Sequence, residues 1–427
     1  MIIRYRTMKK KSIIKKIVCG LIFVLIGGWQ KVAEADHHLT RSIYRQQKTE
    51  NCQVARQQPN FLVFAGGGTP AQNEIAIEKN VLYFQRTLKA MGYDPFSAST
   101  FFANGNDGQA TIRYIDKWGR QQFKVPEIPN IQGKATLKNL QSWFQETPRE
   151  TPNRPIFFYF TGHGIQNQKN SNNNALLLWG NQPLTVQELS KMLDKLPQKT
   201  PVVTMMAQCF SGSFANFIYQ GGDPNKPIAL QTRCGFFATI KTLPSVGCTP
   251  EVNEADYKDY SSSFFAGLSG YNRTGEKVLS ADYNLDGKIS YAEAHAFAKI
   301  DEKTIDLPVS TSEVWLQERA SQAEIKLIWE QPIVNLLSKA RPEQQYVVKT
   351  IVKMFNLDLQ KSYIENGGGI IVKEGINNQV ERAYLIRLAM ELINIGMDQK
   401  IRLDSDSTAI ATLERLIKCE ASSWEDK

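Results

Sequence analysis

Continuous apolar runs alternate along the chain with segments whose apolar residues recur every three or four positions. The runs at 60–65 (NFLVFA), 156–161 (IFFYFT) and 201–207 (PVVTMMA) are typical of strands buried on both faces of a sheet. Two weaker runs predict strands at 96–103 and 235–240, and the helical spacing predicts helices at 74–91, 132–146, 185–196 and 211–219. Such alternation predicts an α/β domain with a mostly parallel sheet, which we place at residues 59–310.

The pattern after about residue 308 is helical only. Helices are predicted at 324–339, 342–355, 379–395 and 407–420. We therefore expect an all-helical C-terminal domain over residues 320–427. Two roles stay open for it: a packing or partner-binding domain, or an inhibitory segment that contacts the active site.

The first 35 residues carry most of the positive charge. They contain eight Lys and Arg residues against one acid, Glu34, so they hold +7 of the net charge of +9. An apolar run at 17–26 and small residues at Ala33 and Ala35 follow the basic part, which is the layout of a secretory signal peptide. We expect a cleaved signal at 1–35, a linker at 36–58 and a secreted or periplasmic protein that meets the membrane only through the signal. An uncleaved anchor is the alternative, and the small remaining charge does not favour a nucleic-acid partner.

Export changes the meaning of the cysteines. Of the six in the chain, Cys19 leaves with the signal and five remain, at positions 52, 209, 234, 248 and 419. Five is an odd number, so at least one thiol is unpaired or pairs between chains. A disulfide between Cys234 and Cys248 is plausible from their spacing, and a pair of Cys52 with Cys419 is a weaker possibility.

Two strand ends carry candidate chemistry. The strand at 156–161 is followed by His163 and Gly164, and the strand at 201–207 is followed by Cys209. Neighbouring parallel strands would bring the thiol and the imidazole to one edge of the sheet, where ligands bind in such folds. An imidazole raises the thiolate fraction of a cysteine, and the backbone N–H groups of Cys209 and Gly164 could stabilise an oxyanion.

The motifs T-G-H-G (161–164) and Q-C-F-S-G-S (208–213) resemble those of the cysteine peptidases that include legumains, caspases and metacaspases, with the legumain-like branch most similar. The resemblance covers residues 59–310 and implies a caspase-like α/β/α sandwich. It also implies an endopeptidase that acts through a thioester acyl-enzyme, with Cys209 as nucleophile, His163 as general base and acid, and Gly164 as an oxyanion donor. Legumains orient the histidine with an asparagine after the first strand, and Asn73 lies at about that place.

The residues that would set specificity depart from the family. Ala207 stands where relatives often carry a polar or acidic residue, so a preference for asparagine is not supported. Four acids after the fifth strand are candidates for a pocket that binds a basic substrate residue: Glu251, Glu254, Asp256 and Asp259.

Residues 282–293 match the 12-residue calcium loop of an EF-hand. Gly287 allows the sharp turn, and the ligand positions are Asp282, Asn284, Asp286, Lys288 (through its carbonyl), Ser290 and Glu293. The exiting helix at 291–300 is clear and the entering helix is not. We expect a Ca²⁺ ion that braces the edge of the catalytic domain.

The sequence leaves two further functions open beside an exported cysteine endopeptidase that acts on a protein or peptide. A transpeptidase or ligase would use the same acyl-enzyme, because water and an amine compete for it. A non-catalytic, calcium-stabilised binding module would use none of this chemistry.

Overall fold

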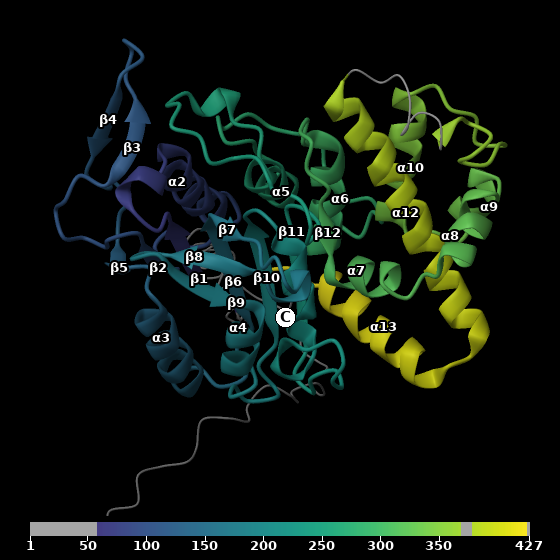
Figure 1. Ribbon diagram of the computed structural model, residues 1–427, viewed down its shortest axis with the longest axis horizontal. Coiled ribbons are helices and arrows are strands. Elements are labelled where there is room, and N and C mark those ends of the chain that lie inside the picture. The colour runs from purple at the N-terminus through teal and green to yellow at the C-terminus, as the bar shows by residue number, and fades with distance from the viewer. Residues whose placement is uncertain (1–57, 369–377, 425–427) are drawn as a thin grey trace, which may run out of the picture. The chain divides into compact units, whose positions relative to one another are not determined.

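The computed structural model describes residues 58–368 and 378–424. The predicted signal at 1–35 and Cys52 lie outside the described residues. A seven-stranded sheet lies at the centre of the α/β part (Figure 1). Its strand order is β12 (Val309–Ser310), β11 (Arg233–Phe237), β10 (Val202–Ala207), β6 (Ile156–Gly162), β1 (Asn60–Gly66), β2 (Ser99–Phe102) and β5 (Ile131–Gly133). All neighbouring pairs are parallel except β11 with β12, so the predicted fold class is confirmed.

The two faces of the sheet pack against different sets of helices. Along β1, Phe61 and Val63 belong to one buried cluster and Leu62 and Phe64 to another, as the period of two in a strand requires. The first cluster includes residues of α2 (Ile75–Ala90), α5 (Tyr260–Ser269) and α6 (Tyr291–Asp301). The second includes residues of α3 (Leu137–Glu150), α4 (Val186–Leu193) and the 3₁₀ helix η3 (Ser211–Ile218). Burial on both faces explains why β1, β6 and β10 are apolar throughout.

Two small sheets extend from the main one. The hairpin of β3 (Ile112–Ile115) and β4 (Gln121–Lys124) follows β2. The second sheet is built from β7 (Gly164–Ile165), β8 (Ala175–Leu178) and β9 (Gln182–Thr185), and it begins directly after the end of β6. It therefore lies beside the strand end that carries His163.

The C-terminal region is helical, as predicted. It contains α7 (Thr311–Gln317), α8 (Gln322–Trp329), α9 (Ile333–Leu337), α10 (Pro342–Met354), α12 (Gln379–Asp404) and α13 (Ser407–Glu420). The predicted helix at 324–339 is two helices, because Pro332 lacks the N–H that would continue α8. Apolar residues of α8 to α12 share one buried cluster with the second face of the sheet, and the described residues form one compact unit. The division into domains near residue 320 stays a prediction.

A disulfide joins the C-terminal helices to the sheet. Cys234 of β11 is bonded to Cys419 of α13, and Cys209 and Cys248 are free thiols. Both predicted pairings are therefore wrong. Cys234 is fully buried on the face of the sheet that α13 reaches. It is therefore bonded to Cys419, which is near in space although 185 residues away in sequence, and not to Cys248, which is near in sequence.

Within residues 58–368 and 378–424, no helix has the length and apolar character to cross a bilayer.

Candidate active site

The strand register brings His163 and Cys209 to one edge of the sheet. Thr161 of β6 pairs with Ala207 of β10, and each of the two site residues follows its strand partner by two positions. The prediction that these residues lie at neighbouring strand ends is confirmed. In the described part of the chain, the Cys209 thiol and the His163 ring form no hydrogen bond with each other.

Gly164 and Cys209 approach each other closely through their backbones. A Cβ atom on Gly164 would lie 2.0 Å from the carbonyl oxygen of Cys209, so only glycine fits at this position. The N–H of Leu177 donates to the His163 carbonyl (3.0 Å). This bond puts Gly164 at a non-hydrogen-bonded position of the β7–β8 ladder. The N–H of Gly164 therefore points away from β8. Within residues 58–368 and 378–424, the N–H of Cys209 also has no partner. Two amides are thus free to bind an oxyanion.

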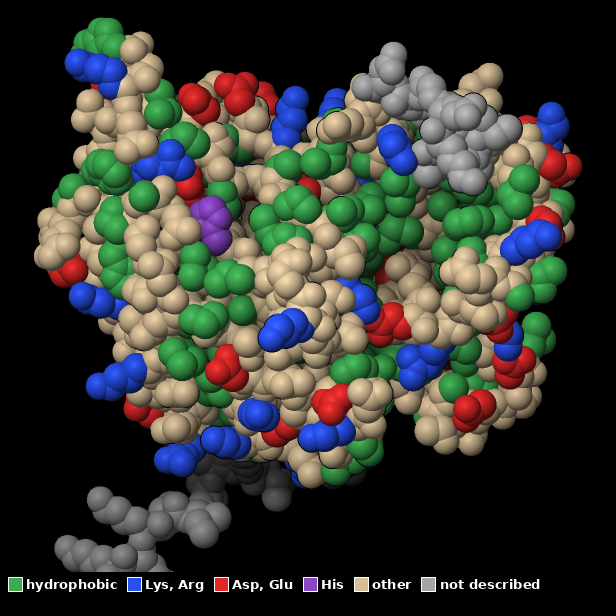
Figure 2. Space-filling model, viewed as in Figure 1, with side chains coloured by type: hydrophobic (Ala, Val, Ile, Leu, Met, Phe, Trp, Pro, Cys, Tyr) green, Lys and Arg blue, Asp and Glu red, His purple; other side chains and the backbone are tan. Residues whose placement is uncertain are grey.

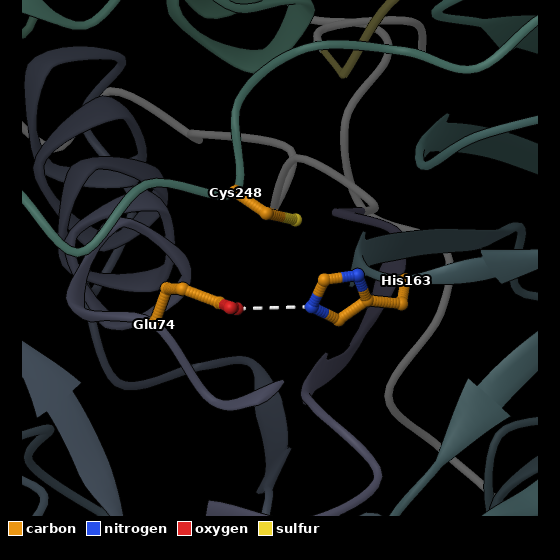
Figure 3. A group of neighbouring side chains, drawn as sticks. All are labelled: Glu74, His163 and Cys248. Atoms are coloured by element: carbon orange, nitrogen blue, oxygen red, sulfur yellow. Dashed lines mark hydrogen bonds and ion pairs between the residues drawn. The ribbon is translucent and has the colours of Figure 1, made fainter. Parts of the chain in front are cut away.

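The His163 ring is held by the turn that precedes α2. Its Nε2 lies 2.9 Å from the Glu74 carboxylate and 2.9 Å from the Gln72 carbonyl (Figure 3). Both partners are acceptors, so Nε2 carries a proton. Arg113 binds the other oxygen of Glu74 at 2.6 Å. Glu74 is buried and the His163 side chain is about a quarter exposed, so this ion pair is shielded at one end and open at the other.

The charges around the ring favour its cationic form. Burial alone would lower the pKa of His163, but the Cys248 thiol and the Glu74 carboxylate outweigh it and raise this pKa to about 11. Burial would likewise raise the pKa of Glu74, yet His163 and Arg113 hold it below its ordinary value. The Glu74 carboxylate at Nε2 thus favours the cationic form of the His163 ring.

Asn73 does not orient His163, contrary to the prediction. Its buried side chain accepts from the N–H of Gly67 (3.2 Å) and donates to the carbonyl of Thr111 (3.3 Å). It fixes the turn between β1 and α2, and that turn presents the next residue, Glu74, to the ring. The sequence signal that could have identified Glu74 is a carboxylate at the N-cap of α2, just after the end of the first strand.

The Cys209 thiol contacts the loop after β11. The N–H of Ser245 donates to its sulfur at 3.3 Å, and the sulfur lies 3.5 Å from the Ser245 carbonyl. The next residue, Phe210, has a left-handed φ of 59°, which turns the chain sharply from the end of β10 into η3. Cys209 therefore lies at a turn, partly exposed, next to the N-terminus of η3.

Cys248 is a site residue that sequence reasoning missed. It is exposed, its sulfur lies 3.5 Å from the Gly162 carbonyl, and it faces Glu74 and His163. Cys248 lies in the loop that follows β11. This loop has no regular structure around Cys248, so no local sequence pattern predicts the path of its backbone.

The four acids proposed for a specificity pocket have different surroundings. Glu254 is paired with Lys79 (3.4 Å) and Arg86 (2.6 Å), and Asp259 is a buried N-cap of α5 that also binds Asn80 (3.0 Å). Glu251 and Asp256 are exposed; Asp256 accepts from Asn253 (2.6 Å) and the Glu251 carbonyl accepts from the Tyr257 hydroxyl, both within the same loop. Local cations and a helix cap thus engage Glu254 and Asp259, and a specificity pocket that uses the four acids stays a prediction.

The loop at 282–293 has the turns of an EF-hand loop. Asp282 accepts from the N–H groups of Asp286 (3.1 Å) and Gly287 (3.0 Å), and Gly287 has a φ of 83°. Asn284 accepts from Asp286 N–H (2.9 Å). Glu293 accepts from Tyr283 N–H (2.9 Å) with one oxygen and caps α6 through Ser290 with the other.

Two further features of this loop concern its flanking helices and the spacing of its acids. α6 is the exiting helix, and within the described residues no helix enters the loop from its N-terminal side. Asp282, Asp286 and Glu293 do not converge as closely as the group at His163 does. The oxygen donors are thus present, with Glu293 turned toward the backbone.

Comparisons with known proteins do not assign a family. No protein-family model matches the chain, and no curated protein matches it. Among solved structures, the protein GSU0716 of Geobacter sulfurreducens is 10% identical, with a TM-score of 0.28; the match covers 44% of this chain and 76% of that one.

Proposed function

We propose that the protein is an exported cysteine endopeptidase with Cys209 as nucleophile and His163 as its acid and base. The observation that carries the proposal is the arrangement at the sheet edge. A thiol and an imidazole follow paired strand positions, and the unpartnered amides of Cys209 and Gly164 lie beside them. A thiol, a proton carrier and oxyanion donors are the groups that acyl transfer through a cysteine requires.

The charge of His163 sets the order of the steps. An imidazolium at the neighbouring strand end would favour the Cys209 thiolate, which attacks the peptide carbonyl and forms a C–S bond while the two amides bind the oxyanion. Nε2 stays bonded to Glu74 and Gln72, so the proton that moves is the one on Nδ1. Nδ1 donates this proton to the leaving amine as the C–N bond breaks.

Hydrolysis of the thioester reverses the role of the ring. Neutral His163 accepts a proton at Nδ1 from water, and the water oxygen attacks the thioester carbonyl. The C–S bond breaks, the carboxylic acid leaves, and the thiolate and imidazolium are restored. Glu74 keeps the ring oriented throughout, because its contact is at the opposite nitrogen (Figure 3).

A peptide-based, thiol-reactive probe tests this assignment. The probe should label Cys209 in the native protein and fail in Cys209→Ala, and labelling should fall in His163→Ala. Heat-denatured protein controls for non-specific thiol chemistry. Mass-spectrometric mapping of the label to Cys248 alone would contradict the assignment, and absence of labelling would favour a binding module. Product analysis with an added amine then separates hydrolysis from transpeptidation.

Calcium is a second part of the proposal. The side-chain oxygens of Asp282, Asn284 and Asp286, the Lys288 carbonyl, Ser290 and Glu293 supply the donor types that Ca²⁺ prefers. The bound ion would supply no catalytic chemistry and would neutralise the loop acids. Because Glu293 lies in the first turn of α6 and contacts Tyr283 at the start of the loop, these residues would brace α6 against the loop.

The face of the molecule in Figure 2 carries basic and acidic side chains interspersed with each other. This mixture supports a protein or peptide substrate more than a polyanion, which would call for a concentrated basic surface.

A further inference from the structure

Glu74, His163 and Cys248 bring three kinds of metal ligand to one point. One carboxylate oxygen, one ring nitrogen and one sulfur lie within 4.8 Å of one another. Figure 3 shows the carboxylate and the ring facing each other with the thiol on one side of the gap between them. The three residues come from the start of α2, the end of β6 and the loop after β11, so the tertiary fold alone brings them together. The proposed mechanism uses no thiol at position 248.

We propose that these three side chains bind Zn²⁺ and that the bound ion inhibits the enzyme; the inhibitory part rests on the proposed function. Zinc is bound by nitrogen, sulfur and carboxylate ligands at about 2.0–2.3 Å in a tetrahedron. Tetrahedral ligands at those bond lengths lie about 3.5 Å apart. The present spread of up to 4.8 Å therefore needs a contraction of about 1 Å. Rotation of the exposed Cys248 side chain would supply this contraction.

The surroundings of the three ligands suit a metal ion. Arg113 holds the second oxygen of Glu74, which orients the carboxylate as an outer partner of a metal ligand does. The ring is partly exposed and Cys248 is exposed, which leaves the fourth position open to water. A carboxylate and a thiolate balance the two positive charges of zinc. Binding releases the Nε2 proton and the Cys248 thiol proton to the solvent.

The bound ion would stop the proton transfers of the proposed mechanism. With zinc on Nε2, the neutral ring keeps one proton, on Nδ1, and its loss would leave an imidazolate. His163 would then have no imidazolium form with which to cycle. The thiolate ligand also separates this site from the loop at 282–293, because sulfur favours zinc and all-oxygen donors favour calcium.

Cobalt absorption and zinc competition on the full chain test the binding directly. Co²⁺ added to metal-free protein should give a thiolate-to-cobalt absorption band that Zn²⁺ abolishes. The band should persist in Cys209→Ser and disappear in Cys248→Ser, and zinc affinity in Cys248→Ser should fall at least about tenfold. Equal binding by Cys248→Ser and the unmodified protein would overturn the proposal, as would a band that depends on Cys209.

The inhibition is measured relative to each protein's own metal-free rate. The zinc concentration that halves peptide cleavage should rise at least about tenfold in Cys248→Ser. Unchanged inhibition in that variant would overturn the regulatory role. Binding that depends on Cys248 in a protein that cleaves no peptide would refute the peptidase and leave the metal site standing, so the two failures are distinguishable.

Discussion

Arg387 of α12 holds the backbone of Asp306, and the Asp306 carboxylate in turn holds the loop that contacts the nucleophile. The guanidinium donates to the Asp306 carbonyl (2.7 and 2.9 Å) and to the carbonyls of Lys299, Glu302 and Thr304. The carboxylate of Asp306 accepts from Val246 N–H (3.1 Å) and from the Ser245 hydroxyl. Since Ser245 contacts the Cys209 sulfur, a chain of hydrogen bonds runs from the C-terminal helices to the candidate active site.

The first prediction concerns this chain. Arg387 is buried, so Arg387→Met leaves several buried carbonyls without a donor and should lower the free energy of unfolding by at least about 3 kcal/mol. Peptide cleavage should fall at temperatures where the variant is still folded, because the Ser245 loop loses its support. Arg382→Met, an exposed change on the same helix, is the control. Full activity in folded Arg387→Met would disprove the coupling.

Gly164→Ala tests the oxyanion site. The added methyl group would meet the Cys209 carbonyl, which forces the two amides apart. We expect kcat/KM to fall at least about 100-fold, the usual effect of losing one oxyanion donor. Ile165→Ala, an exposed neighbour, should change little. A Gly164→Ala protein with near-normal kcat/KM would exclude this oxyanion geometry.

The disulfide between Cys234 and Cys419 should contribute substantially to stability. It closes a loop of 185 residues, and loss of such a bond typically costs about 2–5 kcal/mol. Cys419→Ser should therefore lower the denaturation midpoint, with Lys418→Ser on the same helix as a control. A reducing agent should lower the midpoint of the unmodified protein and leave that of Cys419→Ser where it is.

Glu420 should make stability depend on pH. Burial raises the pKa of this carboxyl to about 7, while hydrogen bonds from Ser312 work against the shift. A carboxyl whose pKa is raised on folding destabilises the protein when it ionises. Its favourable contribution is complete below about pH 4.5 and is lost as the pH rises through 7.

Glu420→Gln should remove that dependence. The difference in unfolding free energy between variant and unmodified protein should grow with pH, by on the order of 3 kcal/mol between pH 4.5 and 8. Denaturant titrations at several pH values measure it. Glu330→Gln, an exposed change, should give a difference independent of pH. A flat difference for Glu420→Gln as well would show that Glu420 ionises normally.

Calcium should raise the melting temperature through the loop at 282–293. For the weak affinity usual in extracellular modules, about 10 mM Ca²⁺ would add about 1–3 kcal/mol. Glu293→Gln keeps a side chain that can cap α6 and should lose this gain. Glu276→Gln, an exposed acid upstream of the loop, should keep it. If a chelator leaves the melting temperature of the unmodified protein unchanged, the proposed stabilisation by calcium is wrong.

The sequence predicts most of the fold because its signals are local. Apolar runs mark β1, β6 and β10, and the capping box of Thr185 and Glu188 marks the start of α4. The predicted helix at 132–146 begins late, at Leu137, because residues 131–133 pair with β2 at the sheet edge. α5 and α7 were not predicted: they are short, and α5 is buried nearly all around, which hides the amphipathic pattern.

Only part of the candidate site can be predicted from the sequence. His163 and Cys209 follow strong strands, so their meeting depends only on strand order. Glu74 and Cys248 reach the ring through a turn and an irregular loop, whose paths are set by tertiary contacts such as Asn73 with Thr111. The prediction of the disulfide pairing failed for the same reason, since Cys419 lies in α13 and the position of that helix depends on the packing of the elements before it.

Trp424, at the end of the described chain, packs against Phe61 of the first strand, with ring centroids 4.9 Å apart, and against Phe157 at 5.1 Å. The first core strand therefore stays incompletely covered until residue 424 has left the ribosome. Chains that stop early would expose these aromatic rings, which makes prematurely terminated products natural targets for chaperones and quality-control proteases.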